Sequence, residues 1–178
     1  MNPENKIDER PNVLRAGVLG ANDGITSVAG VVIGVAASTS NLAIILLAGA
    51  SAALAGAFSM AGGEYVSVST QADTEKMLAK ENGTSMEALK ATNPWHAAIS
   101  SFISFAVGSI LPLLAIWLVP KNFRIIATVI AVAIALFLTG YISAALGGAP
   151  KRPSVIRNVI VGLLTMLVTY IIGTLIHI

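Results

Sequence analysis

Two acidic residues lie inside long apolar stretches of this sequence, where a charge is costly. Asp23 follows Asn22 in a run that is otherwise almost wholly apolar, and Glu64 stands four residues after Met60 in the next run. An ionised side chain at the centre of a membrane helix costs roughly 2.5 to 3.5 kcal/mol on insertion scales, so such residues usually face a pathway or a partner. The other acids lie in polar segments: Glu4, Asp8, Glu9, Asp73, Glu75, Glu81 and Glu87.

The types and spacing of these residues predict a site for a divalent transition metal. Met60 and Glu64 share one face if their segment is a helix, because residues i and i+4 are neighbours on a helix surface. Carboxylates supply hard oxygen ligands, and a thioether adds a softer ligand that Mg²⁺ and Ca²⁺ would not use. We therefore expect Asp23, Met60 and Glu64 to bind Fe²⁺ or Mn²⁺. The remaining ligands would come from Asn22 as an accessory residue, from water, from backbone carbonyls or from a second subunit.

The same two carboxyl groups can also carry protons. At 1.5 Å per residue, Asp23 lies about 15 Å from the membrane edge and Glu64 about 9 Å. A carboxyl group in surroundings of low dielectric holds a proton more readily than one in water, and an arriving cation displaces that proton. Asp23 and Glu64 are therefore the expected proton-coupling residues, with Asp23 the deeper of the two.

Each candidate residue also has a simpler interpretation. Asp23 can cap a broken helix, Glu64 can be an interfacial side chain that reaches toward water, and Met60 can fill a gap in the core. On that interpretation the protein is a non-transporting membrane subunit or scaffold, in which both acids form structural pairs. A carrier for another solute is a further alternative.

The composition is that of an integral membrane protein. Of 178 residues, 55% are hydrophobic and 11% are charged, whereas soluble domains carry about 25% charged residues. The net charge of +2 is too small to indicate a nucleic-acid partner, and the lack of cysteine excludes disulfides and thiolate metal sites. We expect a carrier rather than an enzyme, without a permanently bound cofactor.

Five apolar stretches predict five transmembrane helices. Each is long enough to cross a hydrocarbon layer of about 30 Å as a helix, whereas barrel strands would be about half as long and would alternate. The fold class is therefore an all-α integral membrane protein. The stretches run from about Val13 to Ala37, Leu42 to Ser69, Ala97 to Val119, Phe123 to Leu146 and Ser154 to Ile176.

The basic residues predict the orientation. Of the eleven lysines and arginines, only Lys121 and Arg124 fall on one side of the expected membrane, and the positive-inside rule places the other side in the cytoplasm. The N-terminus is then cytoplasmic and the C-terminus lies outside. The resulting layout is a cytoplasmic tail (1–12), helices one and two (13–69), a short cytoplasmic helical loop (70–96) and helices three to five (97–178).

The loop between the second and third stretches has helical signals of its own. The second helix is expected to continue to Glu81, before Asn82-Gly83 stops it. The capping-box pattern Thr84-Ser85-Met86-Glu87 then predicts a short helix, which Asn93-Pro94 would end. Small residues in the first two membrane stretches, such as Gly20, Gly24 and Gly56, predict close contact between helices.

At the level of motifs, the sequence resembles the vacuolar iron transporter family. The segments LRAGVLGANDGITSVAGVVIGV (14–35) and AGAFSMAGGEYVSVSTQAD (55–73) are similar to the first two spans of that family. The pattern of Phe105, Gly108, Pro112 and Leu113 is similar to its third span, and residues 147–176 resemble its fourth loop and fifth span. The likeness covers nearly the whole chain, in order.

This resemblance implies a homodimer with five spans per chain, which exports Fe²⁺ or Mn²⁺ from the cytosol in exchange for protons. Its partners would be the lipid bilayer, the metal ions and protons, and its ion path would lie at the dimer interface. Asp23 matches the pathway aspartate of the first span, and Met60 and Glu64 match the methionine and glutamate of the second.

The sequence departs from the family in one segment. Typical members carry a glutamate-rich helical domain between the second and third spans, whereas here residues 70–94 hold only four acids. The chain therefore resembles a short member that lacks most of that metal-binding domain, and no residue is assigned to it. The short loops and the lack of an organellar extension favour the cell (inner) membrane of a prokaryote, or the vacuolar membrane in a eukaryote.

Overall fold

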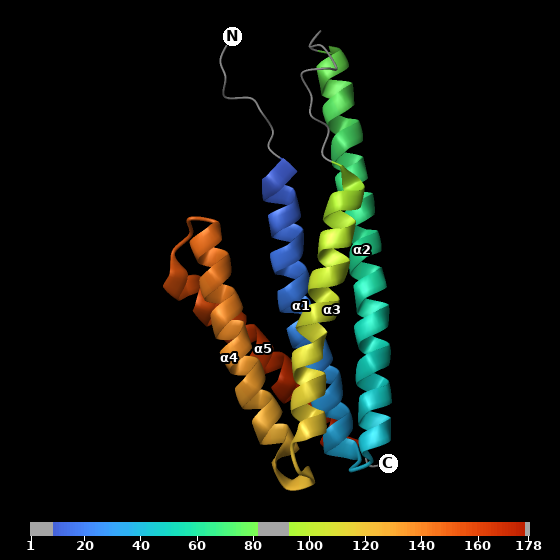
Figure 1. Cartoon of the computed structure of the whole chain (residues 1–178), viewed down its shortest axis with the longest axis vertical. Coiled ribbons are helices and arrows are strands. Elements are labelled where there is room, and N and C mark those ends of the chain that lie inside the picture. Colours follow the sequence, from blue (N-terminus) through green and yellow to red (C-terminus); the bar gives the residue numbers. More distant parts are fainter. Residues whose placement is uncertain (1–8, 82–92, 177–178) are drawn as a thin grey trace.

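Five long helices make up the structure, a computed structural model that describes residues 9–81 and 93–176 (Figure 1). These two ranges contain no strand, and all five helices are long and apolar enough to cross a membrane. The predicted all-helical architecture is therefore confirmed. The helices are α1 (Glu9–Ser38), α2 (Leu42–Glu81), α3 (Pro94–Leu118), α4 (Arg124–Leu146) and α5 (Lys151–Leu175), with a 3-10 helix η3 (Lys121–Phe123) before α4.

Four of the five long helices extend beyond the apolar stretches from which they were predicted, whereas α4 matches its stretch to within one residue. α3 begins at Pro94 rather than near Ala97, because the Asn93 side chain caps it by accepting a hydrogen bond from the backbone N–H of Trp95 over 3.0 Å. Proline is well suited to this first position, since its missing N–H would have no partner there. Asn93-Pro94 thus starts α3, and hydropathy marks the membrane crossing rather than the end of the helix.

α2 is one unbroken helix of 40 residues. It contains the predicted crossing and the predicted continuation to Glu81, and its C-terminal end projects well beyond α1 and α3 (Figure 1). On this projecting end Lys76 and Asp73 form an exposed ion pair at 3.3 Å. The short helix predicted from Thr84 lies outside the described residues.

α1 packs against each of the other four long helices. Its crossing with α3 depends on glycine, since a Cβ atom on Gly20 would lie 2.6 Å from the carbonyl oxygen of Ser101. One turn later, a Cβ atom on Gly24 would overlap the backbone carbonyl of Phe105, while the Phe105 ring fills the space beside Gly56 of α2. Phe105 therefore lies between α1 and α2.

A second close contact joins α1 to α5. A Cβ atom on Gly30 would lie 3.1 Å from the Thr165 side chain, and one on Gly173 would overlap the carbonyl oxygen of Gly34. Such contacts require small residues, as the sequence predicted, because helices inside a membrane associate through close packing rather than through the hydrophobic effect.

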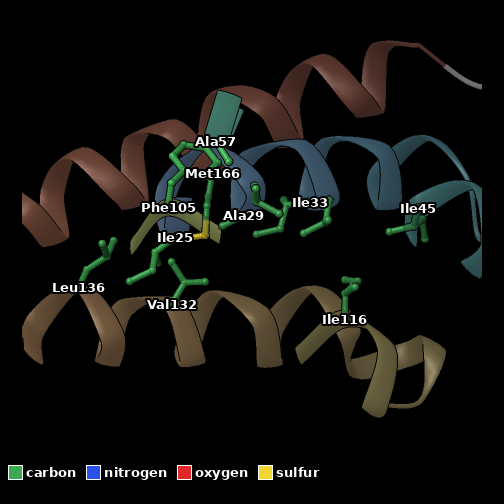
Figure 2. Packing of buried hydrophobic residues seen from close by; sticks show 12 residues of the cluster. Ile25, Ala29, Ile33, Ile45, Ala57, Phe105, Ile116, Val132, Leu136 and Met166 are labelled. Carbon is green, nitrogen blue, oxygen red and sulfur yellow. The ribbon is translucent and has the colours of Figure 1, made fainter. Parts of the chain in front are cut away.

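The buried core draws on all five long helices. Figure 2 shows side chains from α1, α3 and α4, among them Ile25, Phe105 and Val132, which meet between the helices. Met166 of α5 and Ala57 of α2 reach the same cluster. This core fixes α1 and α2 side by side, and these are the two helices that carry the acids.

Candidate functional site

One face of α1 carries the first of the two intramembrane acids. Arg15, Leu19, Asp23 and Ser27 follow one another at intervals of four residues and so share this face. Leu19 is exposed, whereas Asp23 and Ser27 are half-buried. The remaining helices of the chain therefore leave this face of α1 partly open.

Asp23 has a partner one turn further along the same helix. The Oγ of Ser27 donates a hydrogen bond to Oδ1 of Asp23 over 2.6 Å. A hydroxyl can satisfy one carboxylate oxygen but cannot neutralise its charge. The other oxygen of Asp23 forms no hydrogen bond or ion pair with the described residues. The carboxyl group is therefore held in place and still able to bind a cation or a proton.

Glu64 lies on the inner face of α2 and is buried. Its side chain is 8% exposed, and Nη2 of Arg15 donates a hydrogen bond to its Oε2 over 3.3 Å. Val68, four residues later, is also fully buried beside Ala16 of α1. Glu64 thus points into the bundle toward α1.

Met60 precedes Glu64 by one turn on the same helix. It is partly buried and packs against the main hydrophobic core. The structure therefore places Met60 on the inner side of α2, as the shared spacing predicted. This position is equally suited to packing and to a role as a ligand.

Asn22 is turned away from the face that carries Asp23. The hydroxyl of Thr139 on α4 donates a hydrogen bond to Oδ1 of Asn22 over 3.4 Å. The accessory ligand suggested by the sequence thus lies against α4, and the structure does not bring it together with Glu64 or Met60.

A cavity of about 680 Å³ opens between α1, α3 and α4. It is lined mainly by apolar groups, including Gly17 and Ala21 of α1 and Ile142 of α4, and it does not reach Asp23, Met60 or Glu64. An ion would find few ligands there. The cavity is therefore separate from the candidate cation site.

The acids of one chain do not supply a complete set of metal ligands by themselves. Within the ranges that the structure describes, no three His, Cys, Asp or Glu side chains gather closely enough to hold a metal ion. Next to Glu64, a Cβ atom on Gly62 or Gly63 would meet no heavy atom within 4 Å. The outer face of α2 is thus smooth and open at the level of the site.

Sequence reasoning overlooked two residues of this site. The sequence pattern assigned Arg15 only to the basic residues that predict the orientation of the chain in the membrane, and it assigned no role to Ser27. Both lie on the face of α1 that carries Asp23, at positions eight before and four after it. A search for polar residues at helical spacing from Asp23 would have found both.

The five helices are able to span a membrane, which defines a multi-pass membrane protein. The half-buried Asp23 on α1 and the buried Glu64 on α2 form its candidate cation site. The sequence matches the VIT family over residues 14–87 and 75–174. The chain belongs to this family, which confirms the resemblance seen in its motifs.

Plant relatives cover most of the chain. Vacuolar iron transporter homolog 3 of Arabidopsis thaliana is 43% identical over 164 residues, which are 91% of this chain and 82% of the relative. Vacuolar iron transporter homolog 1 of the same plant is 42% identical over 182 residues, or 98% of this chain and 91% of the relative. Vacuolar iron transporter homolog 5 of Oryza sativa subsp. japonica is 42% identical over 165 residues, which are 90% of this chain and 79% of the relative.

Proposed function

We propose that this protein exports Fe²⁺ or Mn²⁺ from the cytosol in exchange for protons, as a carrier rather than an enzyme. The observation that carries the proposal is the burial of Glu64 on α2, across from the face of α1 that carries Asp23, in a chain of the VIT family. The relatives named above are called iron transporters, which supports iron as a substrate. The proposal of Mn²⁺ as a substrate is supported by the chemistry of the ligands, since carboxylate oxygens bind Mn²⁺ as well.

In this proposal Asp23, Met60 and Glu64 contact the metal, and the two carboxyl groups exchange it for protons. Metal binding needs deprotonated ligands, so a cation that binds releases the protons that the empty site holds. Glu64 would capture the ion first, and Asp23 would receive it one or two helical turns deeper. The N-terminus and the segment 70–96 would then face the cytoplasm, as the basic residues predict.

A second copy of the chain would complete the site. Two acids and a thioether leave positions of a metal ion unfilled, and the half-open face of Asp23 and the smooth face of α2 at Gly62 both allow another helix to approach. We therefore propose a homodimer. Gly62→Leu should lower the dimer fraction measured by cross-linking in membranes, whereas Ala145→Leu, on an exposed position of α4, should not.

The relatives also bear on which cellular membrane holds the protein. The relatives reported above are plant proteins whose names place them at the vacuole, which supports a vacuolar membrane in a eukaryotic cell. They give no support to a prokaryotic cell membrane, where the same direction of transport would carry metal out of the cell.

Transport and proton movement can be measured together in proteoliposomes. Vesicles loaded with a pH-sensitive dye receive Mn²⁺ or Fe²⁺, and metal uptake is followed beside the internal pH. Asp23→Asn should abolish metal-driven proton movement, because it keeps the shape of the side chain but removes the anionic ligand and its proton. Glu64→Gln, nearer the entrance, should mainly weaken metal capture. Asp73→Asn, in the exposed pair with Lys76, should behave like the wild type.

A structural role for both acids is the competing interpretation, and one observation favours it. Each acid has a partner within the chain, Ser27 for Asp23 and Arg15 for Glu64. Metal-dependent thermal stabilisation of the purified protein separates the two, since a protein that binds metal gains RT ln(1 + [L]/Kd) and a scaffold gains nothing. No stabilisation by either metal, together with no uptake, would overturn the proposed function.

A further inference from the structure

The ion pair between Arg15 and Glu64 joins α1 to α2 at the candidate site. The two residues are 49 positions apart in sequence, and only the packing of the helices brings Nη2 of Arg15 within 3.3 Å of Oε2 of Glu64. The other ion pair in the described part of the chain, between Lys76 and Asp73, is local to the exposed end of α2. The Arg15 pair is therefore the one that involves a buried acid.

A buried carboxylate must be neutralised by a cation or a proton, because its charge is costly away from water. In the described ranges, Arg15 is the only basic side chain that forms an ion pair with Glu64. Its guanidinium group thus contacts an oxygen that a metal ion bound to Glu64 would need. A divalent cation and the guanidinium group repel each other, so the two compete for this carboxylate.

The two partners differ in how easily they can leave. The side chain of Glu64 is 8% exposed and that of Arg15 is 54% exposed. The two side chains are joined by one hydrogen bond of 3.3 Å, longer than the 2.7 to 2.9 Å typical of charge-assisted hydrogen bonds. Arg15 lies two residues inside the first span, so its long side chain can turn toward the membrane edge, whereas Glu64 stays in place.

Arg15 also lies on the route toward Asp23. It precedes Asp23 by eight residues on the same face of α1, which is two turns or about 12 Å along the helix axis. A cation that moved along this face from the N-terminal end of α1 would meet Arg15 and Glu64 before it reached Asp23.

We propose that Arg15 is a tethered counter-cation, which binds Glu64 when the site is empty and is displaced when a divalent metal binds. The inference rests on the proposed function, in which Glu64 is a metal ligand. Arg15 is a positioning residue that acts through Glu64. Arg15 balances the charge of the Glu64 carboxylate when this acid holds neither metal nor proton, and it competes with the bound metal, which lowers affinity and speeds release.

The test uses the full-length protein in detergent with Mn²⁺ as the probe. Arg15→Gln should unfold at a lower temperature than the wild type without metal, because Glu64 loses its cation. It should bind Mn²⁺ about tenfold more tightly, a typical size for coupling between two sites, and Mn²⁺ should raise its unfolding temperature more than that of the wild type. Arg15→Lys keeps the charge on a compact, strongly hydrated ammonium group, and its Mn²⁺ affinity should fall between the two.

Transport kinetics give an independent readout. In proteoliposomes, Arg15→Gln should lower both the KM for Mn²⁺ and the maximal rate, since tighter binding slows release. A merely structural ion pair predicts the opposite for binding, because a loosened site binds metal more weakly. Lys76→Gln removes the cation of the exposed pair and serves as the matched control, with no change expected in either quantity.

The double variant Arg15→Gln/Glu64→Gln shows whether Arg15 acts through Glu64. In the Glu64→Gln background, loss of Arg15 should leave Mn²⁺ affinity unchanged. Equal or weaker Mn²⁺ binding by Arg15→Gln would overturn the inference while the wild type still transports metal. If Arg15→Gln does not fold, Arg15→Lys takes its place, and Mn²⁺ binding by Arg15→Lys that is equal to or weaker than that of the wild type would overturn the inference. A wild type that neither binds nor transports Mn²⁺ or Fe²⁺ would instead overturn the proposed function, and this inference with it.

Discussion

Ser27 donates a hydrogen bond to Asp23 over 2.6 Å, one turn away on the same helix. This contact orients a half-buried carboxyl group without neutralising it. Glu64, which is buried, is paired instead with the cationic side chain of Arg15. The pairing of Asp23 with a neutral hydroxyl therefore suits a group that must bind and release a positive charge.

Removal of the Ser27 hydroxyl should weaken transport without abolishing it. Ser27→Ala frees the Asp23 side chain to rotate, and a hydrogen bond to a charged group contributes about 1.5 to 3 kcal/mol. We expect the KM for Mn²⁺ in proteoliposomes to rise by about tenfold, while metal-driven proton movement persists. Ser67→Ala, exposed on α2, is the control. Unchanged kinetics in Ser27→Ala would show that the hydrogen bond does not position the acid.

Gly24 of α1 and Gly62 of α2 should differ sharply in their tolerance of a methyl group. Gly24→Ala would force a Cβ atom into the backbone of Phe105, so we expect a loss of about 1 to 3 kcal/mol in stability. Gly62→Ala meets no heavy atom within 4 Å and should be neutral or gain up to about 1 kcal/mol from helix propensity. Thermal unfolding in detergent measures both. Equal stability of the two variants would contradict the close crossing of α1 and α3.

Substitution of Met60 separates a ligand from a core residue. A thioether contributes softness rather than charge, so Met60→Ala should alter the preference among Fe²⁺, Mn²⁺ and Co²⁺ more than it alters proton coupling. Competition between the three metals during uptake gives the ranking. Met60→Leu, which keeps the volume of the side chain, controls for packing. If the ranking is the same in all three proteins, Met60 serves the core alone.

The orientation of the chain can be tested with reporters. The basic residues predict that a reporter after Ile178 lies outside the cytoplasm and that one inserted between Asn82 and Thr84 lies inside. Enzyme fusions active on only one side of a membrane would measure both. Two reporters on the same side would contradict a chain with five crossings.

Much of the fold could be predicted, because membrane helices are encoded by local composition. Apolar stretches of sufficient length located the five long helices, and the predicted helical continuation after Ser69 is present as far as Glu81, the last residue described in this segment. The start of α3 was missed by about a turn, because the Asn93 side chain caps this helix ahead of its apolar stretch. Hydropathy carries no information on such caps.

The candidate site was predicted in part. Asp23 and Glu64 stood out because a charge inside an apolar stretch is rare. The Arg15 pair did not, because it depends on how α1 and α2 are aligned, and this alignment is set by contacts that are distant in sequence. For the same reason the sequence could not show that Asn22 turns toward Thr139 of α4 while its neighbour Asp23 does not.

The position of Phe105 bears on the size of the ion that the site accepts. Its backbone touches α1 at Gly24, directly after Asp23, and its ring touches α2 at Gly56, one turn before Met60 and two before Glu64. A single apolar side chain of α3 thus works as a spacer between the two acid-bearing helices. If Asp23 and Glu64 bind a cation as proposed, the spacing of their helices, and with it the range of ionic radii that fits, depends on the thickness of this phenyl ring.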